Sequence, residues 1–132
     1  MIDFESILNT AEARATVLGC PLVFGDTAVQ NVAANSIGVD FFTLDVTDSS
    51  FVDMSNVNTP AYTIAVRCMG VSAYMRDDAT EIATLIRTDK LLRQFLSAYV
   101  CGFEVSGLSI RKVQNEYDTI KSGWEATLDI TL

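Results

Sequence analysis

Three aspartates come nearest, in type and spacing, to a chemical site. Asp45, Asp48 and Asp53 lie close together in the chain, around the end of a strand-like segment. Carboxylate oxygens are the ligands that Ca²⁺ and Mg²⁺ prefer, so these side chains could bind a hard cation. They lack the ligand pattern and the glycine of an EF-hand, and Asp48 is typical of a residue that begins a turn. We therefore interpret them as solvated loop residues and expect no bound metal.

Asp26 is a second candidate, because its place between Gly25 and Thr27 resembles the setting of a catalytic aspartate. Turn chemistry explains it equally well, since an Asp side chain readily accepts hydrogen bonds from nearby backbone amides. The sequence contains no histidine. The chain therefore cannot hold a Ser-His-Asp or Cys-His catalytic arrangement, or a histidine-ligated metal.

The sequence likewise contains no motif for a nucleotide-binding site or a reactive-cysteine site. The seven glycines form neither a GxGxxG motif nor a P-loop. The three cysteines, Cys20, Cys68 and Cys101, are widely spaced among apolar neighbours, and no two of them form a CxxC pair. We interpret them as small buried hydrophobic residues in a reducing compartment. We expect no catalytic activity and no cofactor.

Charge is distributed unevenly along the chain. The net charge is -8, which disfavours specific nucleic-acid binding because phosphate contacts require Lys and Arg. Residues 1–66 carry eight acidic side chains and a single base, Arg14, whereas residues 67–132 carry nine acids and eight bases. The asymmetry is explained either by solvated faces or by head-to-tail packing of an acidic face on a basic one.

A basic strip on a predicted helix is the first candidate partner surface. Arg87, Lys90 and Arg93 lie largely off the apolar face of the helix expected over residues 78–100. Either they form a solvated helix face, or they contact an acidic neighbouring subunit.

The second candidate partner surface is the segment 48–60, which reads as a long, turn-rich loop closed by Pro60. A loop of this length in a small domain is usually functional or flexible. It carries four apolar residues outside any periodic pattern: Phe51, Val52, Met54 and Val57. These side chains either tuck back into the core or form an exposed patch that marks a partner surface.

Two helices are expected to support these features. The first, ending at Gly19 with Pro21 just beyond, has its apolar residues at helical spacing. The second covers residues 78–100, with Gly102 ending it. Its predicted apolar face consists of Ile82, Leu85, Ile86, Leu92, Phe95, Leu96 and Tyr99.

Four strands are expected from alternating apolar and polar residues, over residues 39–47, 61–71, 103–113 and 124–132. The third has a predicted bulge at Gly107, where the apolar register shifts. Residues 22–24 form a short apolar piece, and residues 25–38 are expected to be a loop. The sequence thus predicts a single α+β domain over residues 1–132, with two helices packed on a mostly antiparallel four-stranded sheet in the order α-β-β-α-β-β.

This arrangement resembles the phage tail-terminator and head-to-tail joining proteins, also called tail-completion proteins. The resemblance covers the element order and the closing stretch, which runs from Tyr117 to Trp124 and continues with apolar Ala126, Leu128 and Ile130. It implies a structural virion protein that forms a homo-oligomeric ring, often a hexamer, which caps the tail tube or joins it to the neck. It implies tail or neck proteins as partners and no catalytic residues.

An acidic ring would suit a channel through which DNA slides without sticking. The protein would then be made in the host cytoplasm and reside in the virion. No apolar run is long enough to span a membrane. The alternative function is a small cytosolic α+β ligand-binding or regulatory domain, with its ligand between sheet and helix. A carboxylate-based enzyme is a third, less favoured reading.

Overall fold

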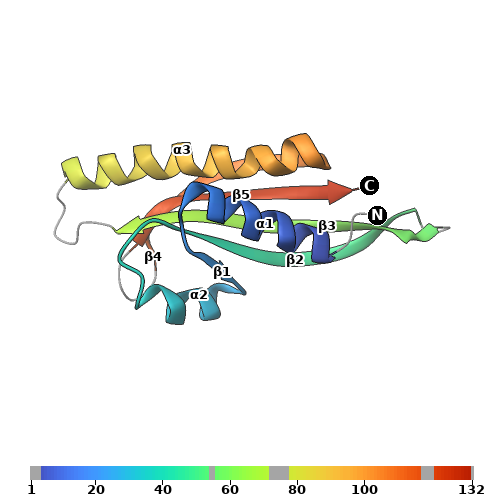
Figure 1. The fold of residues 1–132 in the computed structure, drawn as a ribbon, viewed down its shortest axis with the longest axis horizontal. Coiled ribbons are helices and arrows are strands. Elements are labelled where there is room, and N and C mark those ends of the chain that lie inside the picture. The colour runs from blue at the N-terminus through green and yellow to red at the C-terminus, as the bar shows by residue number, and fades with distance from the viewer. Residues whose placement is uncertain (1–3, 54–55, 72–77, 117–120, 132) are drawn as a thin grey trace.

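The computed structural model describes residues 4–53, 56–71, 78–116 and 121–131, with the backbone alone for residues 50–53, 56–60, 78, 115 and 116. The helices in these ranges are α1 (Phe4–Leu18), α2 (Thr27–Ala34) and α3 (Asp78–Gly102). The strands are β1 (Leu22–Phe24), β2 (Phe41–Asp53), β3 (Asn56–Val71), β4 (Glu104–Glu116) and β5 (Lys121–Thr131). Figure 1 shows their arrangement.

The strands form one sheet in the order β1-β2-β3-β5-β4. β1 pairs parallel with β2, and every other neighbouring pair is antiparallel. The predicted α+β class is therefore confirmed, with a third helix and a fifth strand added to the predicted elements. The described chain runs α-β-α-β-β-α-β-β.

The two faces of the sheet are covered unequally. α1 and α3 lie on one face, and the shorter α2 lies on the other (Figure 1). The larger core fills the space under α1 and α3, where Ile7, Phe95 and Leu128 are fully buried. The Tyr99 hydroxyl donates a 2.8 Å hydrogen bond to the carbonyl of Ile7 and ties the two helices together.

A smaller core lies on the second face, beside α2. Its buried members are Ala34, Phe41, Met69 and Val113. Because successive residues of a strand point to opposite faces, Phe41 belongs to this core and Phe42 to the larger one. Both faces of β2 and β3 are therefore apolar near α2.

α2 is a correction to the loop predicted over residues 25–38. Asp26 is its N-cap, with the side chain accepting a 3.1 Å hydrogen bond from the amide of Val29. Asp26 is thus a helix cap, in agreement with the interpretation that its side chain accepts a hydrogen bond from a nearby backbone amide. We assign it no catalytic role. The helix has eight small or polar residues, too few for a clear helical period.

Two glycine predictions are confirmed by positive φ angles. Gly19 has φ 72° just after α1, and the amides of Gly19 and Cys20 donate to the carbonyls of Thr16 and Ala15 in a Schellman motif. Gly107 has φ 63° at the register shift between β4 and β5, so the predicted bulge is present.

The predicted apolar face of α3 is correct for its second half, but in the first half only Leu85 is half-buried and the two isoleucines are exposed. Leu92 and Phe95 are buried as expected, but Ile82 and Ile86 are 55% and 54% exposed. The buried positions in this part of the helix belong instead to Thr84 and Thr88, and the Thr88 hydroxyl donates a hydrogen bond to the carbonyl of Thr84 at 2.7 Å. A threonine can occupy a buried helix position because the carbonyl one turn back satisfies its hydroxyl.

The loop predicted over residues 48–60 is wrong, because this segment continues β2 and β3 as a hairpin. β3 pairs with β5 only as far as Tyr62, opposite Ile130. β2 and β3 stay paired beyond that point, to Asp53 opposite Asn56. We call residues 48–53 and 56–61 the arm. Strand geometry makes its projection past the sheet roughly 20 Å long, and it reaches beyond the end of β5 in Figure 1.

The arm escaped sequence detection because bulges interrupt its alternation. The register shifts between Val46 and Asp48, and again between Phe51 and Asp53. Pro60 pairs opposite Phe51 in an outer part of the sheet, where a proline is tolerated.

None of the helices in the described ranges is both long and apolar enough to cross a membrane.

Candidate functional site

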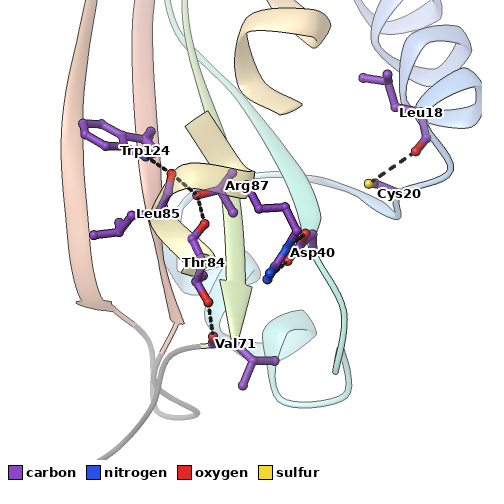
Figure 2. A network of polar contacts seen from close by, with 9 residues as sticks. Leu18, Cys20, Asp40, Val71, Thr84, Leu85, Arg87 and Trp124 are labelled. Atoms are coloured by element: carbon purple, nitrogen blue, oxygen red, sulfur yellow. Dashed lines mark hydrogen bonds and ion pairs between the residues drawn. The ribbon is translucent and has the colours of Figure 1, made fainter. Parts of the chain in front are cut away.

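Arg87, the first residue of the predicted basic strip, is held by an ion pair (Figure 2). Its Nε and Nη2 contact Oδ2 and Oδ1 of Asp40 at 2.5 and 2.9 Å. The hydrogen bond with Asp40 raises the pKa of Arg87. Gly70 lies beside the pair, since a Cβ there would come within 2.5 Å of Asp40 Oδ1. Arg87 therefore fastens α3 to the start of β2.

Two further hydrogen bonds hold this part of α3 on the sheet (Figure 2). The Thr84 hydroxyl donates to the carbonyl of Val71 at 3.1 Å, at the end of β3. The indole Nε1 of Trp124 donates to the carbonyl of Leu85 at 2.8 Å. Polar contacts thus hold the N-terminal half of α3 on the sheet, whereas apolar packing holds its second half there.

Of the other two residues of the basic strip, only one has its charge neutralised by an ion pair among the described residues. Arg93 forms an i, i+4 ion pair with Asp89 at 3.0 Å. Lys90 is exposed and makes no ion pair within the described part of the chain. The strip therefore offers less unpaired positive charge than its sequence suggested. Its contact with an acidic subunit stays a prediction.

The arm and the strip do not form one site. Arg87 is bound at the start of β2 through Asp40, whereas the arm lies at the opposite end of that strand. Phe51 and Val52 belong to β2 and Val57 to β3, while Met54 lies outside the described residues. Any partner that touches both surfaces must extend along the sheet or bind as more than one copy.

Asp45 and Asp48 lie in β2 and not in the predicted loop, and the side chain of Asp53 lies outside the described part of the chain. Asp48 follows the first register shift of β2, and its Oδ1 accepts a 2.8 Å hydrogen bond from the amide of Ser49. No group of three His, Cys, Asp or Glu residues is placed to hold a metal ion among the side chains that the structure describes. The expectation that these aspartates bind no metal stays a prediction.

The cysteines occupy three different environments. Cys68 is buried, as predicted, and burial raises the pKa of its thiol. Cys20 is half-buried, and burial raises its pKa too. Cys101 is exposed, so the prediction of a buried residue is wrong there. It lies in the last turn of α3, beyond the buried Tyr99.

A charged row crosses the sheet on the face opposite α1 and α3, and sequence reasoning missed it. Glu125 in β5 lies between Arg67 in β3 and Arg111 in β4. Its two carboxylate oxygens contact Arg67 Nε at 2.6 Å and Arg111 Nε at 2.9 Å. Glu125 and Arg111 stood at polar positions of predicted strands, but only the strand pairing brings them together. Arg67 is 7% exposed, so its charge depends on this partner.

Glu125→Gln is expected to make folding stability less dependent on pH. Burial acts to raise the pKa of Glu125, but hydrogen bonds from Arg67 and Arg111 and their charges outweigh it, so the net pKa lies below the ordinary value for a glutamate. A carboxylate with a lowered pKa stabilises the fold above its unfolded pKa, and that stability is lost as pH falls through the folded pKa. Urea unfolding of both proteins at pH 7, 5 and 3.5 measures the effect.

The stability gap between wild type and Glu125→Gln should be widest at pH 7 and should narrow towards pH 3.5. Glu12→Gln, at an exposed position of α1, serves as the control. A gap that stays constant across this pH range would show that the Glu125 carboxylate is not stabilised by its two arginines.

A groove opens between α3 and β4. Its volume is about 270 Å³, and Arg93 and Ser97 are among the residues that line it. The apolar lining residues are Leu96, Val100, Cys101, Leu108 and Ile110. Val100 and Leu108 are 52% and 45% exposed, so the groove presents apolar surface to solvent. No pattern in the sequence indicates the groove, because its lining comes from a helix and a strand, whose side chains follow different periods.

The fold and its surfaces define a mixed α+β protein with a five-stranded sheet, a projecting hairpin arm and an apolar groove at one sheet edge. The sequence matches no protein-family model and no curated protein.

Proposed function

We propose that this protein is a structural component of a phage tail or neck, which forms a homo-oligomeric ring that terminates the tail tube or joins it to the head. The arm is the observation that carries the proposal. A two-stranded ribbon is marginally stable by itself in water, because it has no third strand and no core to pack against. An arm of this length therefore suits a chain whose neighbours cover it.

The proposed ring acts without catalysis or cofactor. Its partners are copies of itself and other tail or neck proteins, in a virion assembled from protein made in the host cytoplasm. The net charge of -8 suits a ring through which DNA passes without specific binding. A hexamer is one closed arrangement that the resemblance to tail-terminator proteins implies.

The double substitution Phe51→Ser and Met54→Ser tests the arm together with residue 54, which follows its first strand in the sequence. We expect the melting midpoint to stay nearly unchanged, since surface changes usually stay within about 0.5 kcal/mol. Assembly should weaken by about 2 kcal/mol or more if either side chain is an interface hot spot. Melting and oligomer mass are measured on the same preparation by calorimetry and light scattering.

The matched control is Val17→Ser, which changes a 72% exposed apolar residue on α1. Suppose that the melting midpoint of the double variant falls sharply while the protein that remains folded still has the oligomer mass of the wild type. The arm then belongs to the core of the monomer. If the wild type stays monomeric at all concentrations and forms no ring by electron microscopy, alone or with tail tubes, the ring proposal fails.

The groove favours a second candidate, a small ligand-binding or regulatory domain. It lies between a helix and the sheet and is mainly apolar with one arginine, as small-molecule sites often are. Such a protein would be a monomer or dimer whose melting midpoint rises with a metabolite. A thermal-shift screen with apolar carboxylates, beside the mass measurement, separates the two functions.

A further inference from the structure

The two edges of the sheet differ in kind. β4 pairs with β5 alone and β1 pairs with β2 alone among the described strands, so each leaves one side unpaired. Unpaired strand edges are templates for pairing with another chain. The β4 edge bears the groove with α3. The β1 edge bears Phe24, an aromatic side chain that is 48% exposed.

Phe24 and the groove lie at the two ends of one row across the sheet. Strand pairing aligns Phe24 with Leu44, Leu44 with Val66, Val66 with Ala126, and Ala126 with Ile110. The three inner residues are buried in the larger core, so the row points to the face that α1 and α3 cover. A second copy displaced along this row would bring its Phe24 to the groove beside Ile110.

The Phe24 side chain is already positioned for such a contact. Its ring packs edge-on against Phe4 of α1, with 6.0 Å between ring centroids. Phe4 is itself 39% exposed, so the pair forms an apolar projection at this edge. An aromatic anchor that is held before binding loses little side-chain entropy on docking.

The charges of the two edges are complementary. Arg93 lines the groove, and its side chain is 64% exposed even though it pairs with Asp89 one turn earlier in α3. Asp26, which is exposed, follows Phe24 by two residues. Opposite charges at two edges favour contact between different edges over contact of an edge with itself.

We propose that the β1 edge of one copy, anchored by Phe24, docks in the α3–β4 groove of the next copy. The inference rests on the proposed ring and assigns the surfaces that close it. The contact is heterologous, because it joins two different patches, and a heterologous contact generates a ring when its rotation closes. Each copy then uses one edge for each neighbour.

Two single substitutions and their mixture test this contact. Phe24→Ser removes the anchor, and Leu108→Asp places a charge in the groove. Each variant alone should associate about 30-fold more weakly or worse, the equivalent of about 2 kcal/mol for a hot spot. Mixed in equal amounts, they should form a one-to-one dimer, because each copy keeps the surface that the other has lost. Native mass spectrometry reads both results.

Val17→Asp is the control, since Val17 is 72% exposed on α1 and lies on neither edge. It should assemble as the wild type does. Formation of the mixed dimer also shows that both variants are folded. Two results would overturn the assigned contact and leave the ring proposal standing. In the first, both single variants form rings of the same mass as the wild type. In the second, the mixture remains monomeric while circular dichroism shows that both variants are folded. A wild type without any oligomer would overturn the ring itself.

Discussion

Leu128→Asp is expected to leave no soluble, folded protein. Leu128 is fully buried in β5, and its neighbour across the sheet, Ile64 in β3, is fully buried as well. An unpaired charge in such a place costs several kcal/mol, which approaches the roughly 5–15 kcal/mol that stabilises a whole domain. The soluble fraction after expression, and circular dichroism of whatever remains soluble, measure the result.

Leu128→Met is the matched control, because it keeps the volume and the apolar character of the side chain. It should cost less than about 1.5 kcal/mol and remain soluble. Soluble Leu128→Asp protein with a cooperative melt near that of the wild type would show that this strand face is not the core.

Gly123→Ala is expected to lower the melting midpoint by roughly 10 °C. Gly123 lies in β5 opposite Met69 of β3. A Cβ at this position would overlap the backbone carbonyl oxygen of Cys68 and come within 3.0 Å of the Met69 Cα. Backbone in the middle of a sheet cannot move aside without disturbing its hydrogen bonds, so the cost lies at or above the upper end of about 1–3 kcal/mol for overpacking. Calorimetry measures the midpoint.

Gly38→Ala is the control for adding a methyl group, because no atom lies within 4 Å of a Cβ built there. Its melting midpoint should stay close to that of the wild type. If both alanine variants melt alike, the close approach of β5 to β3 at Gly123 is not a constraint on the fold.

The functional surfaces were only partly visible in the sequence. The basic strip was found, but its ion pair with Asp40 joins residues 47 positions apart and has no local signal. The charged row of Arg67, Glu125 and Arg111 likewise depends on strand order. The groove and the exposed edge at Phe24 exist because β4 and β1 are the outermost strands of the sheet. A periodic pattern within one segment carries no information on the order of strands.

Local periodicity was sufficient where one element buries one face against a single core. It determined α1 and its end at Gly19, the second half of α3, the bulge at Gly107, and the alternation of Trp124 to Ile130 in β5. In α1, in the second half of α3 and in β5 the buried residues recur at the helical or strand spacing, because the same side of the element meets the core throughout. At Gly107 a break in the strand spacing marks the bulge.

Tertiary structure decided the rest. α2 is too short for its pattern to be read, and it forms where Asp26 caps it and Ala34 packs beside Phe41. The arm exists because β2 and β3 pair with each other beyond the end of β5, despite bulges that break their alternation. Ile82 and Ile86 are exposed because α3 turns its threonines to the sheet. Pairing between distant segments sets each of these outcomes, and no single segment encodes its partner.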